Sequence, residues 1–261
     1  KKPSKKSPAP PFTTSTLQQA ASSRLGYSVK QTMVLAQKLY ESGHISYMRT
    51  DSVNLSETAL GQAKKQIEAE FGKNYYHKRV FKTKTSGAQE AHEAIRPTDF
   101  KNLNAGDDPK QNKLYKLIWS RAIASQMADA EIERTELSLT NDGIKPKFIA
   151  KGEVVIFPGY LKAYQANKQA EPDILPDMQS GDILHYEEIT ATETYTRPPA
   201  RYTEASLVKK LESEGIGRPS TYAPTISTIQ ARGYVEKSSG EGKTRPVTII
   251  TLNDAKQTKT E

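Results

Sequence analysis

The stretch SVKQTMVLAQKLYESGHISYMRTDS, residues 28–52, contains the pattern that decides the fold. A capping-box sequence begins at Ser28, and apolar residues then recur at helical spacing until Gly43, which predicts a helix that ends at a glycine. The apolar face of this helix is predicted from Val29, Met33, Ala36, Leu39 and Tyr40. Ile45 and Tyr47 then alternate with polar residues, which predicts a short strand. Tyr47 is therefore either a core aromatic on that strand or a reactive residue.

A second copy of this outline occurs near the other end of the chain. The first copy includes a preceding helix over about 16–24, and the second has helices over about 204–213 and 220–232 followed by a strand. A gapless offset of 190 residues (207 − 17) places Leu17 on Leu207, Leu39 on Ile229, Gly43 on Gly233 and Ile45 on Val235. We interpret this as a weak duplication of a helix-turn-helix or winged-helix unit, with chance similarity of two glycine-capped helix pairs as the alternative. Tyr47 aligns with Lys237, so the repeated unit does not require the tyrosine.

In the rest of the chain, the composition and the hydrophobic pattern change along the sequence. The Lys/Pro-rich start is expected to be an extended linker, because prolines and like charges oppose a helix. Residues 56–71 and 109–127 have amphipathic helical patterns, and β-branched, alternating segments separated by glycine turns follow. GEGKTRPVTIITL, residues 240–252, is a candidate wing hairpin for the last helical unit. The predicted order is a linker or end of an arch (1–11), a helical domain (12–133), a β-rich segment (134–197) and a partial helical domain (198–261).

The composition indicates a soluble globular protein, and its charge distribution fits a polyanionic partner. The net charge is +8 and the chain has no cysteine, which excludes disulfides, thiol catalysis and zinc-thiolate sites. Residues 1–40 carry seven Lys or Arg and no acidic residue, whereas residues 41–200 are nearly neutral. Basic ends on a neutral body fit nucleic acid, although a solubilising surface is an equal alternative on charge alone. No apolar run approaches the roughly 18 residues of a membrane span, so we expect a cytoplasmic protein without a membrane partner.

Tyr47 and Arg49 lie two residues apart and would face the same side of a strand. A tyrosine has an unperturbed pKa of about 10, so as a nucleophile it needs a proton acceptor or a stabilised phenolate. Attack on a phosphodiester adds negative charge to the non-bridging oxygens, and Arg49 is a candidate for stabilising that charge. Asp51 is a candidate for orienting Arg49 through a bidentate pair. Spacing alone nevertheless favours a core tyrosine over a catalytic one.

AQEAHEAIRPTD, residues 88–99, is a second polar cluster. His92 is a candidate hydrogen-bond donor to a phosphate or a candidate proton shuttle. Arg96, four residues later, would share its face of a helix. Taken singly, each is more often a surface residue or a satisfied hydrogen-bonding residue. Asp107 and Asp108 precede a proline at a predicted helix start, and no pattern of acidic or histidine residues predicts a metal site in this chain.

These motifs together resemble the type IA DNA topoisomerases, and most closely bacterial topoisomerase I. The matching stretches are residues 11–52, 89–99 and 198–235, which occur in the family's order, and SYMRTDS with AHEAIRPTD is highly specific. The resemblance implies that Tyr47 is the nucleophile that becomes joined to a 5′-phosphate of one DNA strand and frees a 3′-hydroxyl. It implies that Arg49 lies next to that phosphate and that His92 belongs to the same active-site region.

The resemblance also implies the architecture and the partners. It implies a torus in which a CAP-like or winged-helix domain that carries the tyrosine lifts from a β-rich arch, with a second small winged-helix-like domain at the base. The partner is DNA, preferentially single-stranded, and further contacts are expected from Arg96, Arg201, Arg218 and Ser220. The family's amino-terminal acidic toprim domain, which holds Mg²⁺, has no counterpart here, nor do the carboxy-terminal zinc modules of some relatives. We therefore expect a nucleoid-associated fragment that has no cofactor of its own and relaxes nothing alone.

Two other functions are alternatives that share some of these sequence features. A tyrosine recombinase also uses Arg, His and Tyr, but in the order Arg, HxxR, Tyr, whereas here Tyr47 comes first and the histidine motif is HxxxR. A tandem winged-helix protein without catalysis would bind duplex DNA through recognition helices at 28–42 and 220–232. Comparing affinities for single-stranded and duplex DNA over a salt series separates these readings.

Overall fold

The computed structural model describes residues 1–81, 92–141, 143–164, 174–239, 242, 244–253 and 258–260. These residues form six α-helices, two short 3-10 helices and two three-stranded antiparallel sheets, which confirms a mixed α and β fold. Packing divides the chain into two units. The first unit combines Lys1–Leu175 with Tyr202–Tyr234, and the second combines Pro176–Arg201 with Val235–Glu261.

Two helices at the start of the first unit follow the predicted pattern closely. They are α1 (Thr14–Leu25) and α2 (Val29–Glu41). Thr13 caps α1, and Gly26 ends the helix in the left-handed conformation. The side chain of Ser28 caps α2 by accepting a hydrogen bond from the Gln31 N–H. Tyr40 departs from the predicted apolar face, since its side chain is 40% exposed.

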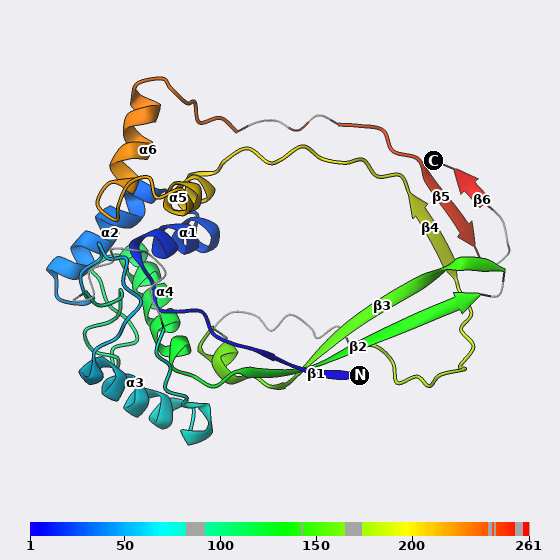
Figure 1. Ribbon diagram of the computed structural model, residues 1–261, viewed down its shortest axis with the longest axis horizontal. Coiled ribbons are helices and arrows are strands. Elements are labelled where there is room, and N and C mark those ends of the chain that lie inside the picture. The colour runs from blue at the N-terminus through cyan, green and yellow to red at the C-terminus, as the bar shows by residue number, and fades with distance from the viewer. Residues whose placement is uncertain are drawn as a thin grey trace. The chain divides into compact units, whose positions relative to one another are not determined.

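The main core of the first unit forms around α4. The remaining helices of this lobe are α3 (Glu57–Glu70), η1 (Lys73–Tyr75) and α4 (Pro109–Ser125). Asp108 caps α4 through the N–H groups of Lys110 and Gln111, as its place before a proline predicts. α4 packs against α1, α2 and α3 and is buried along most of its length (Figure 1). The Trp119 indole N–H donates to the Phe100 carbonyl, so even its polar group is satisfied inside the core.

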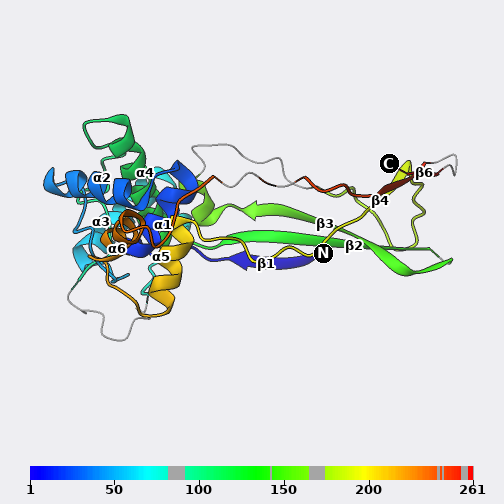
Figure 2. The same cartoon turned by 90° about the horizontal axis from the view of Figure 1, so that it is seen from above.

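A long sheet extends from this helical lobe. It consists of β1 (Lys2–Lys6), β2 (Ala130–Asn141) and β3 (Ile144–Phe157) in the order β1-β2-β3. β2 and β3 run away from the helices as an antiparallel ribbon (Figure 2). Beyond β3, η2 (Gly159–Tyr164) packs on α4, and Gly159 has φ 48° with space for no Cβ, because the Asp129 carbonyl oxygen would lie 2.2 Å from it.

The linker expected at the start of the chain is an edge strand. Lys2–Lys6 pairs antiparallel with the first residues of β2, and Lys5 forms an ion pair with Glu131 at 2.9 Å. Pro3 is tolerated because an edge strand has one side free of ladder hydrogen bonds. The like charges that oppose a helix are matched here by acidic residues on the neighbouring strands, which local sequence cannot reveal.

Two further helices, α5 (Glu204–Ser213) and α6 (Tyr222–Ala231), pack against α1 and α2 (Figure 1). A small second core joins them, and it consists of Val29, Val208, Tyr222 and Ile226. The Glu204 carboxylate accepts a hydrogen bond from the Val29 N–H at 2.9 Å, which satisfies a free donor at the start of α2. The Ser15 hydroxyl donates to Glu212 at 2.7 Å.

The second unit contains one sheet with the order β4-β5-β6. Its strands are β4 (Glu188–Thr192), β5 (Ile249–Asn253) and β6 (Thr258–Thr260). The wing hairpin predicted within 240–252 is wrong as an assignment to the last helical unit, because β5 pairs with β4 and β6 instead. β-branched residues predicted a strand correctly but not its partner.

The two copies of the repeated outline share their helices, and neither copy has the strand that was predicted after its glycine. Gly43 (φ 74°) and Gly233 (φ 71°) end α2 and α6 in the same left-handed conformation. The strand predicted after each glycine is absent: Ile45 forms one isolated bridge with Pro97, and residues 235–239 have no regular structure. The duplicated feature is therefore the helix pair with its glycine stop.

Candidate active site

Tyr47 lies on an irregular loop directly after α2, and its side chain is 46% exposed. This exposure excludes the reading of Tyr47 as a core aromatic. Side chains nevertheless alternate along the loop as they would on a strand: Arg49 is exposed like Tyr47, whereas Met48 and Thr50 are buried. The expected sharing of one side by Tyr47 and Arg49 is therefore present without the strand that was predicted to cause it.

Thr14, at the start of α1, fixes the part of this loop that follows Tyr47. Its buried hydroxyl donates to the Met48 carbonyl at 2.8 Å and accepts from the Thr50 N–H at 2.8 Å. The Thr14 N–H, one of the donors left free at a helix start, donates to the Thr50 carbonyl at 2.9 Å. These bonds bracket Arg49, so its backbone is fixed by a residue 35 positions earlier (49 − 14).

Ser46 bonds the part of the loop that precedes Tyr47 to residues 92–98. The Ser46 hydroxyl donates to the Ala94 carbonyl at 2.7 Å and accepts from the Arg96 N–H at 2.9 Å. A helix through His92 and Arg96 was predicted and is wrong for the described part of that cluster, because residues 92–98 contain no helix. Pro97 forms an isolated bridge with Ile45, and the Thr98 N–H donates to the His44 carbonyl. Residues 88–91 of the cluster lie outside the described residues. His92 is exposed at the start of this segment.

Arg96 is engaged within the protein. Its guanidinium donates to the Glu93 carboxylate at 2.6 Å, and its side chain is 16% exposed. Burial opposes ionisation of Glu93, but hydrogen bonds from the Ser56 N–H and from Arg96 outweigh it and hold the pKa of Glu93 below its ordinary value. Arg96 therefore supports the segment that begins at His92, while Arg49 keeps an exposed side chain.

Arg49 lies at a basic groove between α2 and α6, with a volume of about 460 Å³. Its cationic residues are Lys30, Lys38 and Arg49, and Met33, Val34, Ala223 and Pro224 give it an apolar lining. Gln37 and Ser227 complete the described lining, in which no side chain is acidic. A groove with cations and apolar surface can hold a sugar–phosphate backbone and its bases without reading their order. Sequence reasoning missed this groove because the lysines on α2 look like an ordinary solvated helix face.

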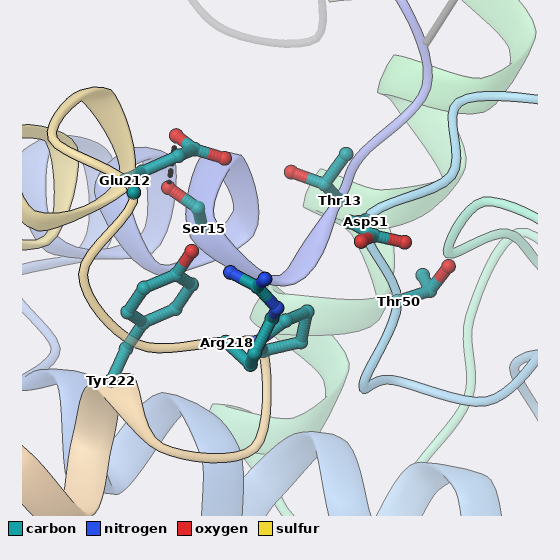
Figure 3. A pocket seen from close by; sticks show the side chains of 9 residues that line it. Thr13, Ser15, Thr50, Asp51, Glu212, Arg218 and Tyr222 are labelled. Carbon is teal, nitrogen blue, oxygen red and sulfur yellow. Dashed lines mark hydrogen bonds between the residues drawn. The ribbon is translucent and has the colours of Figure 1, made fainter. Parts of the chain in front are cut away.

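A smaller pocket of about 30 Å³ lies between the start of α1, the loop after Tyr47, and the turn before α6. Figure 3 shows the Arg218 side chain in this pocket, with Ser15, Glu212 and Tyr222 on one side and Thr13 and Asp51 on the other. The pKa of the Tyr222 phenol is raised by burial and by Glu212, although Arg218 opposes this shift. The expected Arg49–Asp51 pair is absent from the described ion pairs, and the two residues line different pockets.

The remaining predicted residues lie in the second helical pair or outside it. Arg218 is exposed at the turn before α6, where its guanidinium donates to the Gly217 carbonyl at 3.0 Å, and Ser220 is exposed on the same turn. Arg201 is exposed and belongs to the second unit. The structure therefore bonds the loop that carries Tyr47 and Arg49 to residues 94–96 through Ser46, and it places Arg218 in the pocket lined by Thr50 and Asp51 of the same loop.

The described residues contain no group of three or more His, Cys, Asp or Glu side chains placed to hold a metal ion. No helix among them is long and apolar enough to cross a membrane.

Comparisons with known proteins agree along most of the chain. The family model described as DNA topoisomerase matches residues 1–250. DNA topoisomerase 1 of Pseudomonas aeruginosa is 50% identical over 241 residues, which cover 90% of this chain and 27% of that protein. The prokaryotic-type DNA topoisomerase 1 of Acanthamoeba polyphaga mimivirus is 46% identical over 268 residues, covering 95% of this chain and 31% of that protein. The structure of full-length topoisomerase I from Thermotoga maritima matches with a TM-score of 0.75 and 38% identity, covering 92% of this chain and 40% of that chain.

Proposed function

This chain belongs to the DNA topoisomerase family, and on that premise we propose that it is the tyrosine-bearing part of a type IA DNA topoisomerase. It spans between a quarter and a third of the length of the curated relatives cited above, 27% and 31% of the two proteins. The observation that carries the proposal is an exposed Tyr47 beside an exposed Arg49, on a loop that Thr14 and Ser46 fix from both sides.

The proposed reaction is a reversible transfer of one phosphodiester. The Tyr47 phenol oxygen bonds to phosphorus as the bond to the 3′-oxygen breaks, the phenol loses its proton, and the 3′-oxygen gains one. Arg49 stabilises the added negative charge on the non-bridging oxygens, and His92 donates a hydrogen bond to the phosphate. The phosphotyrosyl bond retains a phosphodiester, so the reverse attack by the 3′-hydroxyl rejoins the strand without a nucleotide cofactor.

The basic groove between α2 and α6 supports a single strand as the substrate. Lys30, Lys38 and Arg49 supply cations for a backbone, and the apolar lining supplies surface for exposed bases. Bases are available for such contacts only when they are unpaired. We therefore expect stronger binding to single-stranded than to duplex DNA, with an affinity that falls as salt rises.

The acidic toprim domain implied by the family resemblance is the proposed partner that completes this site. The described residues do not fit a magnesium ion, because no cluster of three acidic or histidine side chains is present among them. The reaction steps above accordingly use only Tyr47, Arg49 and His92. We expect this chain alone to bind single-stranded DNA weakly and to leave supercoiled plasmid unrelaxed.

The test traps the covalent intermediate with detergent after the toprim domain is supplied in trans or by fusion. A 3′-end-labelled oligonucleotide should transfer its label to the protein, and a 5′-end-labelled one should not, since the tyrosine keeps the 5′-phosphate side. Tyr47→Phe should abolish the adduct, whereas Tyr234→Phe, which alters an exposed tyrosine on the turn after α6, should not. Transfer of the 5′ label means that the tyrosine is joined to the 3′-phosphate side of the break, which indicates a recombinase-type reaction. An adduct that persists in Tyr47→Phe excludes Tyr47 as the nucleophile.

A further inference from the structure

Among the described residues, the side chain of Tyr47 makes one ring contact, and its partner is Tyr40. The two ring centroids lie 5.3 Å apart with an interplanar angle of 68°, an edge-to-face arrangement. Within the described residues, no hydrogen bond or ion pair involves the Tyr47 side chain, which is 46% exposed. Among the described residues, the ring of Tyr40 is thus the aromatic surface that limits where the Tyr47 phenol points.

The turn at the end of α2 creates this contact. Tyr40 occupies the last turn of α2, where the helix hydrogen bonds fix its backbone. Gly43, in the left-handed conformation, donates its N–H to the Tyr40 carbonyl at 2.8 Å, and the His44 N–H donates to the Leu39 carbonyl at 2.8 Å. This reversal of the chain places Tyr47, on the loop after α2, beside the last turn of that helix. Tyr40 therefore offers a rigid platform to a side chain on an irregular loop.

Tyr40 has no role in the core that explains an aromatic residue at this position. Its side chain is 40% exposed, although the helical pattern places it on the apolar face. The buried residues of the same helix are Val29, Thr32, Leu35, Ala36 and Leu39. Its one described ring contact is the one with Tyr47.

We propose that Tyr40 is a positioning residue that sets the direction of the Tyr47 phenol for attack on the phosphodiester, an inference that rests on the proposed function. A free tyrosine side chain samples several staggered χ1 positions, and an edge-to-face contact favours one of them. A nucleophile held in the attacking position reacts faster because less orientational freedom is lost on reaching the transition state. The Tyr40 hydroxyl is not needed for this role, since the contact is made by the ring.

The first measurement follows the Tyr47 ring by NMR in this chain, with isotope-labelled tyrosine assigned through Tyr47→Phe. Tyr40→Leu should remove the ring-current shift of the Tyr47 ring protons, and Tyr40→Phe should retain it. Leucine is a good helix former, so α2 should persist. The resonance of the buried Tyr115 reports whether the core is unchanged, and Tyr234→Leu serves as the control at another exposed tyrosine. A Tyr47 shift that is the same with and without a ring at position 40 overturns the proposal.

The second measurement is the rate of covalent adduct formation at saturating single-stranded DNA, with the toprim domain supplied. Tyr40→Leu should lower this rate about three- to tenfold, the scale of one aromatic pair, and leave the dissociation constant for DNA unchanged. Tyr40→Phe should restore the rate to within about twofold, because it restores the ring.

Three outcomes contradict the proposal or its premise, and they are distinguishable. Equal loss of rate in Tyr40→Phe and Tyr40→Leu means that the hydroxyl acts, which overturns positioning by the ring. Weaker DNA binding with an unchanged rate at saturation means that Tyr40 contacts DNA, which also overturns it. Absence of any adduct in the unmodified protein contradicts the proposed function, and the NMR comparison still decides whether Tyr40 orients Tyr47.

Discussion

Val208→Ala tests whether α5 and α6 are held to α1 and α2 by the small second core. Val208 is fully buried there together with Val29, Tyr222 and Ile226. The substitution removes two carbon atoms, which costs about 1.6 kcal/mol at about 0.8 kcal/mol for each buried methylene. A residual cavity that does not collapse adds up to about 1 kcal/mol, for a total of about 1.6–2.6 kcal/mol.

This loss should appear locally, because the main core around α4 does not include Val208. A change of about 1.6–2.6 kcal/mol corresponds to an opened population that is roughly 15- to 80-fold larger. Amide hydrogen exchange should therefore show about that fall in protection for α5 and α6, with α4 unchanged. Val34→Ala is the matched control, since Val34 is 49% exposed on α2 and its truncation should change protection little. An equal fall of protection in α4, or none in α5 and α6, would refute the reasoning.

Two further predictions concern the helical lobe. Thr14→Val should destabilise the protein by about 1–3 kcal/mol in denaturant unfolding, because the buried Thr50 N–H loses its acceptor, whereas Thr14→Ser should cost less because it keeps the hydroxyl; equal losses would argue against the hydroxyl bond. Burial, and to a smaller degree Asp99, raises the pKa of Tyr115 to about 12, so the folded protein keeps a proton that the unfolded chain releases near pH 10. Stability should fall between pH 10 and 12 by about 1.4 kcal/mol per pH unit more than in Tyr115→Phe, and parallel pH profiles of the two proteins would contradict this.

Helices and their ends were predictable from short patterns. The Ser28 and Asp108 caps and the glycine stop at Gly26 act on N–H and carbonyl groups within about four residues, so neighbouring sequence is sufficient to indicate them. The strand expected at Ile45 failed for the opposite reason. A strand needs a partner for its backbone groups, and in this loop Thr14 and residues 92–98 take those groups individually.

The residues of the candidate site were predictable from the sequence, but the contacts that hold them in place were not. The motif with Tyr47 and Arg49 identified the exposed pair, and the alternation of side chains placed them on one side. The irregular path of residues 92–98 was not indicated locally, because the cluster has the spacing of a helix, a spacing at which Glu93 and Arg96 would also pair. The basic groove also escaped prediction, since three of its nine lining residues come from α6, far along the chain.

The sequence by itself determined where helices begin and end, which family the motifs resemble, and which tyrosine is the candidate nucleophile. These properties depend on backbone groups and side chains a few residues apart, whose geometry the helix repeat dictates. The tertiary structure alone decided that the lysine-rich start is an edge strand, that Thr14 and Ser46 fix the loop, and that the groove at Arg49 exists. Each of these depends on hydrogen bonds or packing between residues tens to hundreds of positions apart, and only the folded backbone sets the distance between such groups.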